Sequence, residues 1–304
     1  AAYPLESHGH LFEPFYKSLC VEIEAIGGLL KDLGIAVESV YLGGGTPTTI
    51  QGEKLVHLLE LVRTHLLTPE SREFTVEAGR PETLSLETLH ILAEFGVDRI
   101  SINPQSMHNE TLQRVGRQHT VEDVITAYNQ AREVGIPLIN MDIILGLPGE
   151  DLNHVRHTLE RIERLQPDNL TVHSLALKRA SRLRKTVEYL NIAQEQGKQM
   201  AQLSAEYCAK WGLAPYYLYR QRYILSDLEN IGYARPGTES VYNVQMMEER
   251  QTIIALGGGG ITKLVSPDLT LVRLANPKCP AAYTQSIENS LSSKLWQIRQ
   301  HLVV

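Results

Sequence analysis

The stretch Tyr41-Leu42-Gly43-Gly44-Gly45-Thr46-Pro47-Thr48 lies where an apolar run ends and an amphipathic pattern begins. Residues 38–42 have the composition of a short strand, and residues 49–56 begin a helical pattern. Successive glycines reach backbone angles that other residues avoid, and they let main-chain groups approach a ligand closely. At the carboxyl end of a parallel strand, Gly43, Gly44 and Gly45 would line the floor of a pocket. The alternative is a glycine-rich turn that binds nothing, and the glycines alone do not decide between the two.

Composition limits the classes of protein to which the chain can belong. Its 304 residues include 43% hydrophobic and 21% charged residues, which is ordinary for a globular protein. No segment approaches the roughly 20 apolar residues that span a bilayer, and no secretory leader opens the chain, so we predict a cytoplasmic protein without a membrane span. The net charge of −6 argues against nucleic acid as a partner. Cys20, Cys208 and Cys279 are far apart, which predicts buried, unreactive thiols and no metal site.

Strand-like and helix-like segments alternate along the first part of the chain. Strands are predicted at 39–42, 73–77, 99–103, 138–145 and 170–174, and helices at 11–33, 52–67, 85–95, 121–134 and 150–165. Helices between strands imply parallel pairing through right-handed crossovers, hence a barrel or a doubly wound sheet. In both architectures ligands bind at the carboxyl ends of the strands.

The rhythm changes near Lys178, where we place a boundary between a domain of residues 1–178 and a second of residues 179–304. Five basic residues between Lys178 and Lys185 are suited to carboxylates, or they are simply a solvated helix start. Tyrosines at 216, 217, 219 and 223 could pack against a flat ring or belong to a half-buried strand. The glycines 257–260 form a close-approach loop or a flexible turn, and a last helix is predicted at 281–302.

Four polar residues lie within, at the end of, or after the predicted strands. Glu77 ends the second strand, Gln105 follows the third, Arg117 lies on the next helix, and Asp142 lies within the fourth strand. Carboxylate and amide oxygens accept hydrogen bonds from sugar hydroxyls, and a guanidinium pairs with a carboxylate. Each residue also has a plain structural interpretation as a cap, a loop amide or a surface ion pair. Asp142 departs furthest from that interpretation, because burying a carboxylate among Met141, Ile143 and Ile144 is costly without a partner.

These segments together resemble a known family. The motifs are Gly43-Gly44-Gly45-Thr46-Pro47-Thr48, Thr75-Val76-Glu77-Ala78, Gln105-Ser106, Gly116-Arg117-Gln118-His119 and 142–148, followed by Gly232-Tyr233-Ala234-Arg235-Pro236-Gly237. Their order and spacing are similar to those of radical S-adenosylmethionine (SAM) enzymes, and more narrowly of the oxygen-independent coproporphyrinogen III oxidase group. The resemblance covers about residues 4–263 and implies a partial (β/α)6 TIM-like barrel with a smaller C-terminal α+β region that covers the substrate.

The resemblance also implies roles for individual residues. Gly43, Gly44 and Gly45 would contact the methionyl amino group of S-adenosylmethionine, and Arg117 its carboxylate; Thr46 would also belong to the cofactor site. Gln105 and Asp142 would hold the ribose, with Glu77 beside them. No catalytic residue is assigned. Family members cleave S-adenosylmethionine reductively and use the radical to convert propionates of a tetrapyrrole into vinyl groups, with electrons from an external donor.

One departure from the family pattern concerns the 4Fe-4S cluster, which family members bind with three cysteines in a CxxxCxxC loop after the first strand. That strand and loop would precede Ala1, and the three cysteines of the chain have the wrong spacing to replace them. We expect that this segment of the protein has been removed or left out of the sequence, and that the chain alone is inactive. The alternative is a derivative of the family that has no cluster.

Three functional hypotheses follow. The first is a radical SAM oxidoreductase of the coproporphyrinogen dehydrogenase type, which acts in haem biosynthesis. The second is a haem- or porphyrin-binding protein, or a haem-trafficking protein, without oxidase activity. The third is a partial barrel with another small-molecule chemistry, which requires that S-adenosylmethionine does not bind.

Overall fold

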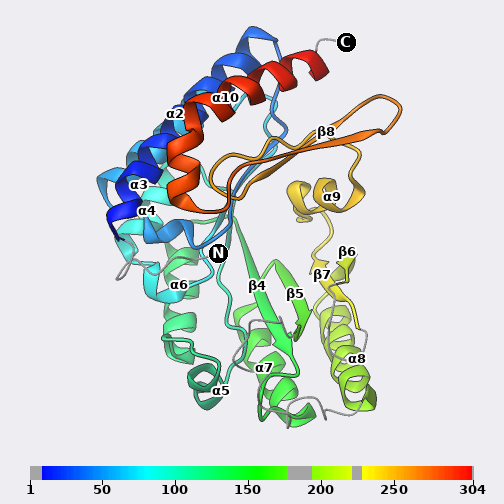
Figure 1. Cartoon of the computed structure of the whole chain (residues 1–304). Helices are drawn as coiled ribbons and strands as arrows, with labels where there is room; N and C mark the ends of the chain where they lie inside the picture. Colours follow the sequence, from blue (N-terminus) through cyan, green and yellow to red (C-terminus); the bar gives the residue numbers. More distant parts are fainter. Residues whose placement is uncertain (1–8, 177–193, 221–227, 303–304) are drawn as a thin grey trace. The chain divides into compact units, whose positions relative to one another are not determined.

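The computed structural model describes residues 9–176, 194–220 and 228–302 (Figure 1). The chain folds into two compact units. Unit 1 joins Ala1–Phe74 to Gln245–Val304, and unit 2 is Thr75–Val244. Helix α9 (Val241–Glu248) spans the boundary between the two units.

Unit 1 combines the two ends of the chain. Its elements are η1 (Gly9–Leu11), α2 (Phe12–Asp32), β1 (Ser39–Leu42), η2 (Pro47–Thr49), α3 (Glu53–His65), the antiparallel pair β8 (Ile261–Val265) and β9 (Leu271–Ala275), and α10 (Pro280–Leu302). Ile26 and Leu30 of α2 form an apolar core with Leu291 and Ile298 of α10. The presence of α10 and of the β8–β9 pair confirms the predicted last helix and the predicted α+β character of the C-terminal region.

A buried ion pair ties α2 to α10 inside unit 1. Glu22, 1% exposed, accepts hydrogen bonds from Lys294 Nζ at 2.8 Å, Tyr283 Oη at 2.6 Å and the Gly257 amide at 2.7 Å. Burial raises the pKa of Glu22, but Lys294 and the other donors outweigh it, so the pKa lies below its ordinary value of 4.5. The first glycine of the 257–260 run is thus anchored to a buried carboxylate, which indicates a structural role for it.

Two adjacent glycines of α2 have different surroundings. A Cβ added to Gly27 would lie 2.5 Å from the carbonyl oxygen of His65 at the end of α3. A Cβ added to Gly28 would meet no other described atom within 4 Å. Gly27 therefore permits the close approach of α2 and α3, whereas Gly28 has no such requirement.

Unit 2 alternates strands and helices up to β5 and ends in antiparallel strands. Its elements are β2 (Glu73–Glu77, which begins two residues before the unit), η3 (Pro81–Thr83), α4 (Leu86–Glu94), β3 (Arg99–Ser101), α5 (Asn109–Arg114), α6 (Val121–Glu133), β4 (Leu138–Leu145), α7 (Leu152–Leu165), β5 (Asn169–Ser174), α8 (Gln194–Lys210), β6 (Ala214–Tyr219) and β7 (Asn230–Ala234). Capping boxes begin two helices, with Thr120 before α6 and Asp151 before α7.

The large sheet has the strand order β1-β2-β3-β4-β5-β7-β6. Strands β2, β3, β4 and β5 pair in parallel, whereas β7 pairs antiparallel with both β5 and β6. A helix separates each parallel pair in the sequence, as the alternating pattern predicted. The predicted mostly parallel α/β fold of the partial-barrel type is confirmed, and antiparallel β7 and β6 complete it.

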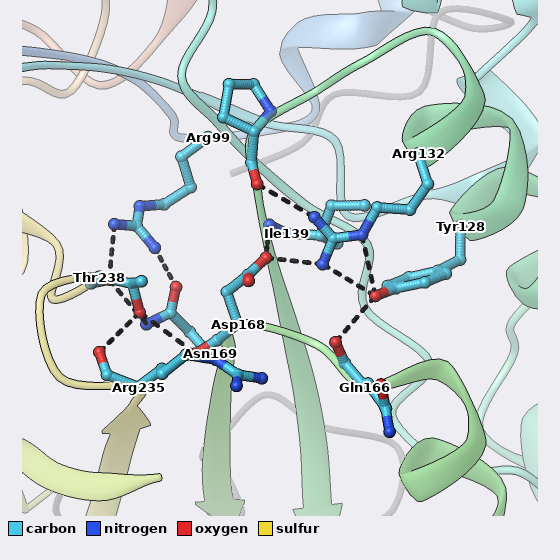
Figure 2. A network of polar contacts seen from close by, with 10 residues as sticks. Arg99, Tyr128, Arg132, Ile139, Gln166, Asp168, Asn169, Arg235 and Thr238 are labelled. Atoms are coloured by element: carbon cyan, nitrogen blue, oxygen red, sulfur yellow. Dashed lines mark hydrogen bonds and ion pairs between the residues drawn. The ribbon is translucent and has the colours of Figure 1, made fainter. Parts of the chain in front are cut away.

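A polar network fixes the amino ends of β3, β4 and β5 (Figure 2). Asp168 accepts hydrogen bonds from Arg132 Nη2 at 2.6 Å and from the Ile139 amide at 2.9 Å. The Thr238 carbonyl accepts from Arg99 Nη2 and from Asn169 Nδ2, both at 2.8 Å (Figure 2). Because these residues lie at the amino ends of the strands, where barrel proteins are stabilised and do not bind substrate, we assign the network a structural role.

Part of the motif 232–237 takes part in this network. The Arg235 amide donates to the Asp168 carbonyl at 3.0 Å, and the Thr238 amide donates to the Arg235 carbonyl at 2.9 Å. The segment therefore closes the turn between β7 and α9 and holds it against the start of β5.

Several sequence expectations meet the structure differently. The boundary at Lys178, the basic residues 178–185 and Tyr223 lie outside the described residues, so the split into residues 1–178 and 179–304 stays a prediction. Cys20 and Cys208 are buried as expected, but Cys279 is exposed, since it lies on the surface at the start of α10. In the described part of the chain, no helix is both long and apolar enough to cross a membrane.

Candidate functional site

Strand β4 has two unlike faces, and the less buried one carries the candidate site. Ile139, Met141, Ile143 and Leu145 are buried, whereas Leu138, Asn140, Asp142 and Ile144 are only partly buried. Successive side chains on a strand point to opposite faces, so Asn140 and Asp142 lie together on the open face. Because Asp142 lies level with Thr171 of β5, the same face of β5 bears Asn169, Thr171 and His173.

Asp142 is held by polar neighbours on both of its carboxylate oxygens. Oδ1 accepts a hydrogen bond from Asn140 Nδ2 at 2.8 Å, and Oδ2 lies 3.5 Å from His173 Nε2. Burial raises the pKa of Asp142, but His173, then Asn140 and Thr171, outweigh burial, so the pKa lies below its ordinary value. Asp142 is therefore an ionised acceptor at neutral pH, and 19% of its side chain remains exposed.

Gln105 lies beside Asp142 through main-chain pairing with β4. Its amide donates to the Asp142 carbonyl at 3.0 Å, and its own carbonyl accepts from the Ile144 amide at 2.9 Å. Its φ of +65° belongs to the left-handed region, which costs a residue with a side chain about 1–3 kcal/mol. Backbone strain of this kind gathers at functional sites, and here it occurs in a buried glutamine whose main chain pairs with that of Asp142.

Glu77 ends β2, and it lies level with Ser101 at the end of β3. Burial raises the pKa of Tyr242 to about 12, with the Glu77 charge adding to it, so these two side chains are neighbours. A Cβ on Gly79 would come 2.8 Å from Asn103 Nδ2, so the loops after β2 and β3 approach one another closely. Glu77 thus lies at the carboxyl ends of adjoining parallel strands, as predicted.

Arg117 follows α5, and its guanidinium is partly buried. Burial lowers the pKa of Arg117 and nearby Arg80 lowers it further, while Glu82 and Asp142 act in the opposite direction. Glu82 in turn lies 3.8 Å from Arg80 Nη1 and 3.3 Å from His119 Nδ1. An arginine keeps its charge under these conditions, so Arg117 is a cation within electrostatic range of Asp142.

Unit 2 therefore gathers Glu77, Gln105, Arg117 and Asp142 around the carboxyl ends of β2 to β4. Gly43, Gly44, Gly45 and Thr46 belong to unit 1, where they follow β1. In that loop Gly44 has a φ of +110°, which glycine adopts readily, and the Thr46 carbonyl accepts a hydrogen bond from Thr49 Oγ1 at 2.7 Å. The roles of all eight residues stay predictions.

Sequence reasoning missed several polar residues near Asp142. It gave His173 no functional role, yet His173 contacts Asp142 and also Tyr219, whose hydroxyl lies 3.3 Å from His173 Nδ1. The alternation of polar residues at 169, 171 and 173 was the available signal. Ser101 Oγ and Asn103 Oδ1 are also buried without a hydrogen-bond partner among the described residues, and no motif singled them out.

Three comparisons agree on the class of protein. The model of the radical SAM superfamily matches residues 13–162. The solved structure of coproporphyrinogen III oxidase (HemN) from Escherichia coli, a radical SAM enzyme, shares the fold with a TM-score of 0.69 at 20% identity. It covers 93% of this chain and 64% of that one. The chain belongs to the radical SAM superfamily.

Curated relatives narrow the class. Over 302 residues the chain is 43% identical to the oxygen-independent coproporphyrinogen-III oxidase-like protein HemZ of Bacillus subtilis. The match covers 98% of this chain and 60% of HemZ. Over 157 residues the chain is 37% identical to the heme chaperone HemW of Bacillus subtilis, which covers 51% of this chain and 41% of HemW. Within the superfamily, the chain is therefore similar to coproporphyrinogen III oxidase-like proteins, and it spans about three fifths of the length of HemZ.

The residues of this chain suit S-adenosylmethionine but do not provide ligands for a 4Fe-4S cluster. Radical SAM proteins use S-adenosylmethionine and a 4Fe-4S cluster. Asp142, Gln105 and the buried unpartnered oxygens of Ser101 and Asn103 suit a ribose, and Arg117 suits a carboxylate. No group of three metal-ligating side chains converges among the described residues, and the three cysteines do not form one. A cluster would need ligands other than these residues.

Proposed function

We propose that this chain is the S-adenosylmethionine-binding part of a radical SAM oxidoreductase that converts propionate side chains of a tetrapyrrole into vinyl groups. The observation that carries the proposal is the grouping of Glu77, Gln105, Arg117 and Asp142 in unit 2 at neighbouring strand ends. The name of the HemZ relative, which is similar over nearly the whole chain, supports coproporphyrinogen III as substrate. The cluster ligands would lie outside this sequence.

Within this proposal the residues of the chain bind and orient the cofactor. Asp142 and Gln105 would accept hydrogen bonds from the ribose hydroxyls, with Glu77 beside them. Arg117 would pair with the methionyl carboxylate, and the glycines 43–45 would accept the amino group through main-chain carbonyls. Once cleaved with one electron from an external donor through the cluster, S-adenosylmethionine would supply the radical that removes a hydrogen atom from the substrate. Each propionate would thereby lose that hydrogen atom, carbon dioxide and one electron, which would pass to an acceptor.

The likeness to HemW favours a second candidate function, the binding of haem or a porphyrin without turnover. Both functions use a tetrapyrrole, so binding alone does not separate them. The full-length gene product, purified without oxygen and reconstituted with iron and sulfide, should be incubated with coproporphyrinogen III, S-adenosylmethionine and a reductant. The proposal predicts loss of 44 mass units plus two hydrogens for each propionate, about two per porphyrinogen, with 5′-deoxyadenosine as co-product. Tight haem binding with no mass change would contradict it and favour the second candidate.

A further inference from the structure

A row of side chains crosses four strands on the open face of the sheet. Asp142 of β4 lies level with Thr171 of β5, Thr171 with Gly232 of β7, and Gly232 with Tyr217 of β6. Thr171 Oγ1 lies 3.3 Å from both Asn140 Oδ1 and the Tyr217 hydroxyl. The carboxylate proposed to bind the ribose is therefore one end of a polar row that reaches the edge strand β6.

His173 lies one step further along the same face, beside this row. Its Nε2 lies 3.5 Å from Asp142 Oδ2, and its Nδ1 lies 3.3 Å from the Tyr219 hydroxyl. A phenol that donates to Nδ1 leaves the proton on Nε2, which is the ring nitrogen 3.5 Å from the carboxylate. The other tautomer would face the Nε2 lone pair toward the negatively charged oxygen. The contacts therefore favour a hydrogen-bonded chain from Tyr219 through His173 to Asp142. Comparable chains orient the side chains that bind metal ions in metalloproteins.

The position of Tyr219 is itself fixed by packing. The rings of Tyr217 and Tyr219 are nearly parallel, with 4° between their planes and 6.4 Å between their centroids. Tyr217 lies across Gly232, where an added Cβ would come 1.8 Å from the ring carbon Cε1. Glycine at 232 thus admits the Tyr217 ring, and Tyr217 supports the ring of Tyr219.

The donors on Asp142 occupy only part of its accepting capacity. An ionised carboxylate has about four lone-pair positions, and Asn140 and His173 approach one on each oxygen. Thr171 also stabilises the Asp142 charge, but its hydroxyl donates to Asn140 Oδ1 at 3.3 Å. The remaining position on each oxygen suits a pair of neighbouring hydroxyl groups. Rotation of the carboxylate would lose that match, and His173 opposes the rotation by holding Oδ2.

We infer that His173, backed by Tyr219, is the positioning residue that orients Asp142 toward the vicinal hydroxyls of the ribose. The inference rests on the proposed binding of ribose at Asp142. His173 touches neither cofactor nor substrate in this account and acts through Asp142 alone. Its contribution should therefore appear only with ligands that carry both hydroxyls.

The test uses two probes that need no iron–sulfur cluster, 5′-methylthioadenosine and its 2′,3′-dideoxy analogue. Calorimetric titration of the whole chain gives the ratio of their dissociation constants. His173→Phe should weaken binding of the diol about tenfold, as expected for a misdirected hydrogen bond to a charged acceptor, and leave the dideoxy analogue unchanged. His173→Gln, which keeps an N–H donor, should restore part of the ratio, and Tyr219→Phe should lower it by a smaller factor.

Controls separate positioning from folding and from failure of the proposed function. His90→Phe, at an exposed position on α4, should leave both affinities unchanged. If His173→Phe unfolds, the comparison of His173→Gln with Tyr219→Phe still measures the ratio. A wild-type ratio near one would overturn ribose binding at Asp142 and the inference with it. A large wild-type ratio that persists in the His173 variants would overturn the inference alone.

Discussion

Lys294→Met should destabilise unit 1 by leaving Glu22 as a buried charge without a counter-ion. The two side chains are 6% and 2% exposed and lie 2.8 Å apart. Removal of one partner of a buried pair costs about 3–5 kcal/mol. We expect about 3 kcal/mol at pH 7, at the lower end, because Glu22 keeps donors from Tyr283 and the Gly257 amide.

The assay is urea unfolding followed by the fluorescence of Trp296 on α10, in a Trp211→Phe background that removes the other of the two tryptophans. Adding Glu22→Gln to Lys294→Met should recover at least half of the loss, because the amide still accepts hydrogen bonds and carries no charge. Lys17→Met, an exposed lysine 3.8 Å from Glu13, should leave the unfolding midpoint unchanged.

The effect of Lys294→Met should also depend on pH. The native pKa of Glu22 lies below its ordinary value of 4.5, so its stabilisation is present above about pH 4.5 and is lost as the pH falls through the native pKa. Without Lys294, burial raises the pKa of Glu22 and the carboxyl protonates early. The difference between the two proteins should therefore shrink in acid. A loss of unfolding free energy below about 1 kcal/mol at pH 7 would refute the reasoning. A loss of the same size at pH 7 and in acid, below the native pKa of Glu22, would refute it as well.

Five further substitutions have definite expected outcomes. Gly27→Ala should lower the thermal midpoint and cost about 1–3 kcal/mol through its clash with His65, whereas Gly28→Ala should gain up to about 1 kcal/mol of helix propensity; the reverse order would be inconsistent with the packing of α2. Gly232→Ala should cost about 1–3 kcal/mol in urea unfolding, since its Cβ meets the Tyr217 ring, and an unchanged midpoint would show that the ring moves freely. Gln105→Gly should unfold no more easily than wild type, because it relieves the φ of +65°, yet bind S-adenosylhomocysteine more weakly in calorimetry. Asp168→Ala should cost about 2 kcal/mol by breaking its contacts in Figure 2 and leave that affinity intact; a matching loss of affinity would link the network to the site.

The alternation of strands and helices could be predicted because glycine and proline mark the boundaries between the elements. Segments such as Gly96-Val97-Asp98 and Gly135-Ile136-Pro137 precede β3 and β4, and the helices between strands require parallel pairing. Antiparallel β6 and β7 left no comparable signal, because their tyrosines and glycine fit several structures. Pairing partners far apart in the chain depend on the tertiary fold.

The candidate site was predicted in its residue types and not in its geometry. Asp142 stood out because a carboxylate within an apolar strand needs partners. Its partner His173 was missed, since only the register that sets Asp142 level with Thr171 brings the imidazole to the carboxylate. The left-handed backbone of Gln105 was equally unreadable, as glutamine has no preference for that region.

The most direct test of the central claim is a calorimetric titration of S-adenosylmethionine into the chain and into its Asp142→Ala and Arg117→Met variants. The account predicts about one bound molecule per chain and affinity about tenfold or more lower in each variant, because each loses a charge-assisted contact. Circular dichroism should confirm that both variants stay folded. Absence of binding by the chain, or equal affinity in all three proteins, would contradict the assignment of this site to S-adenosylmethionine.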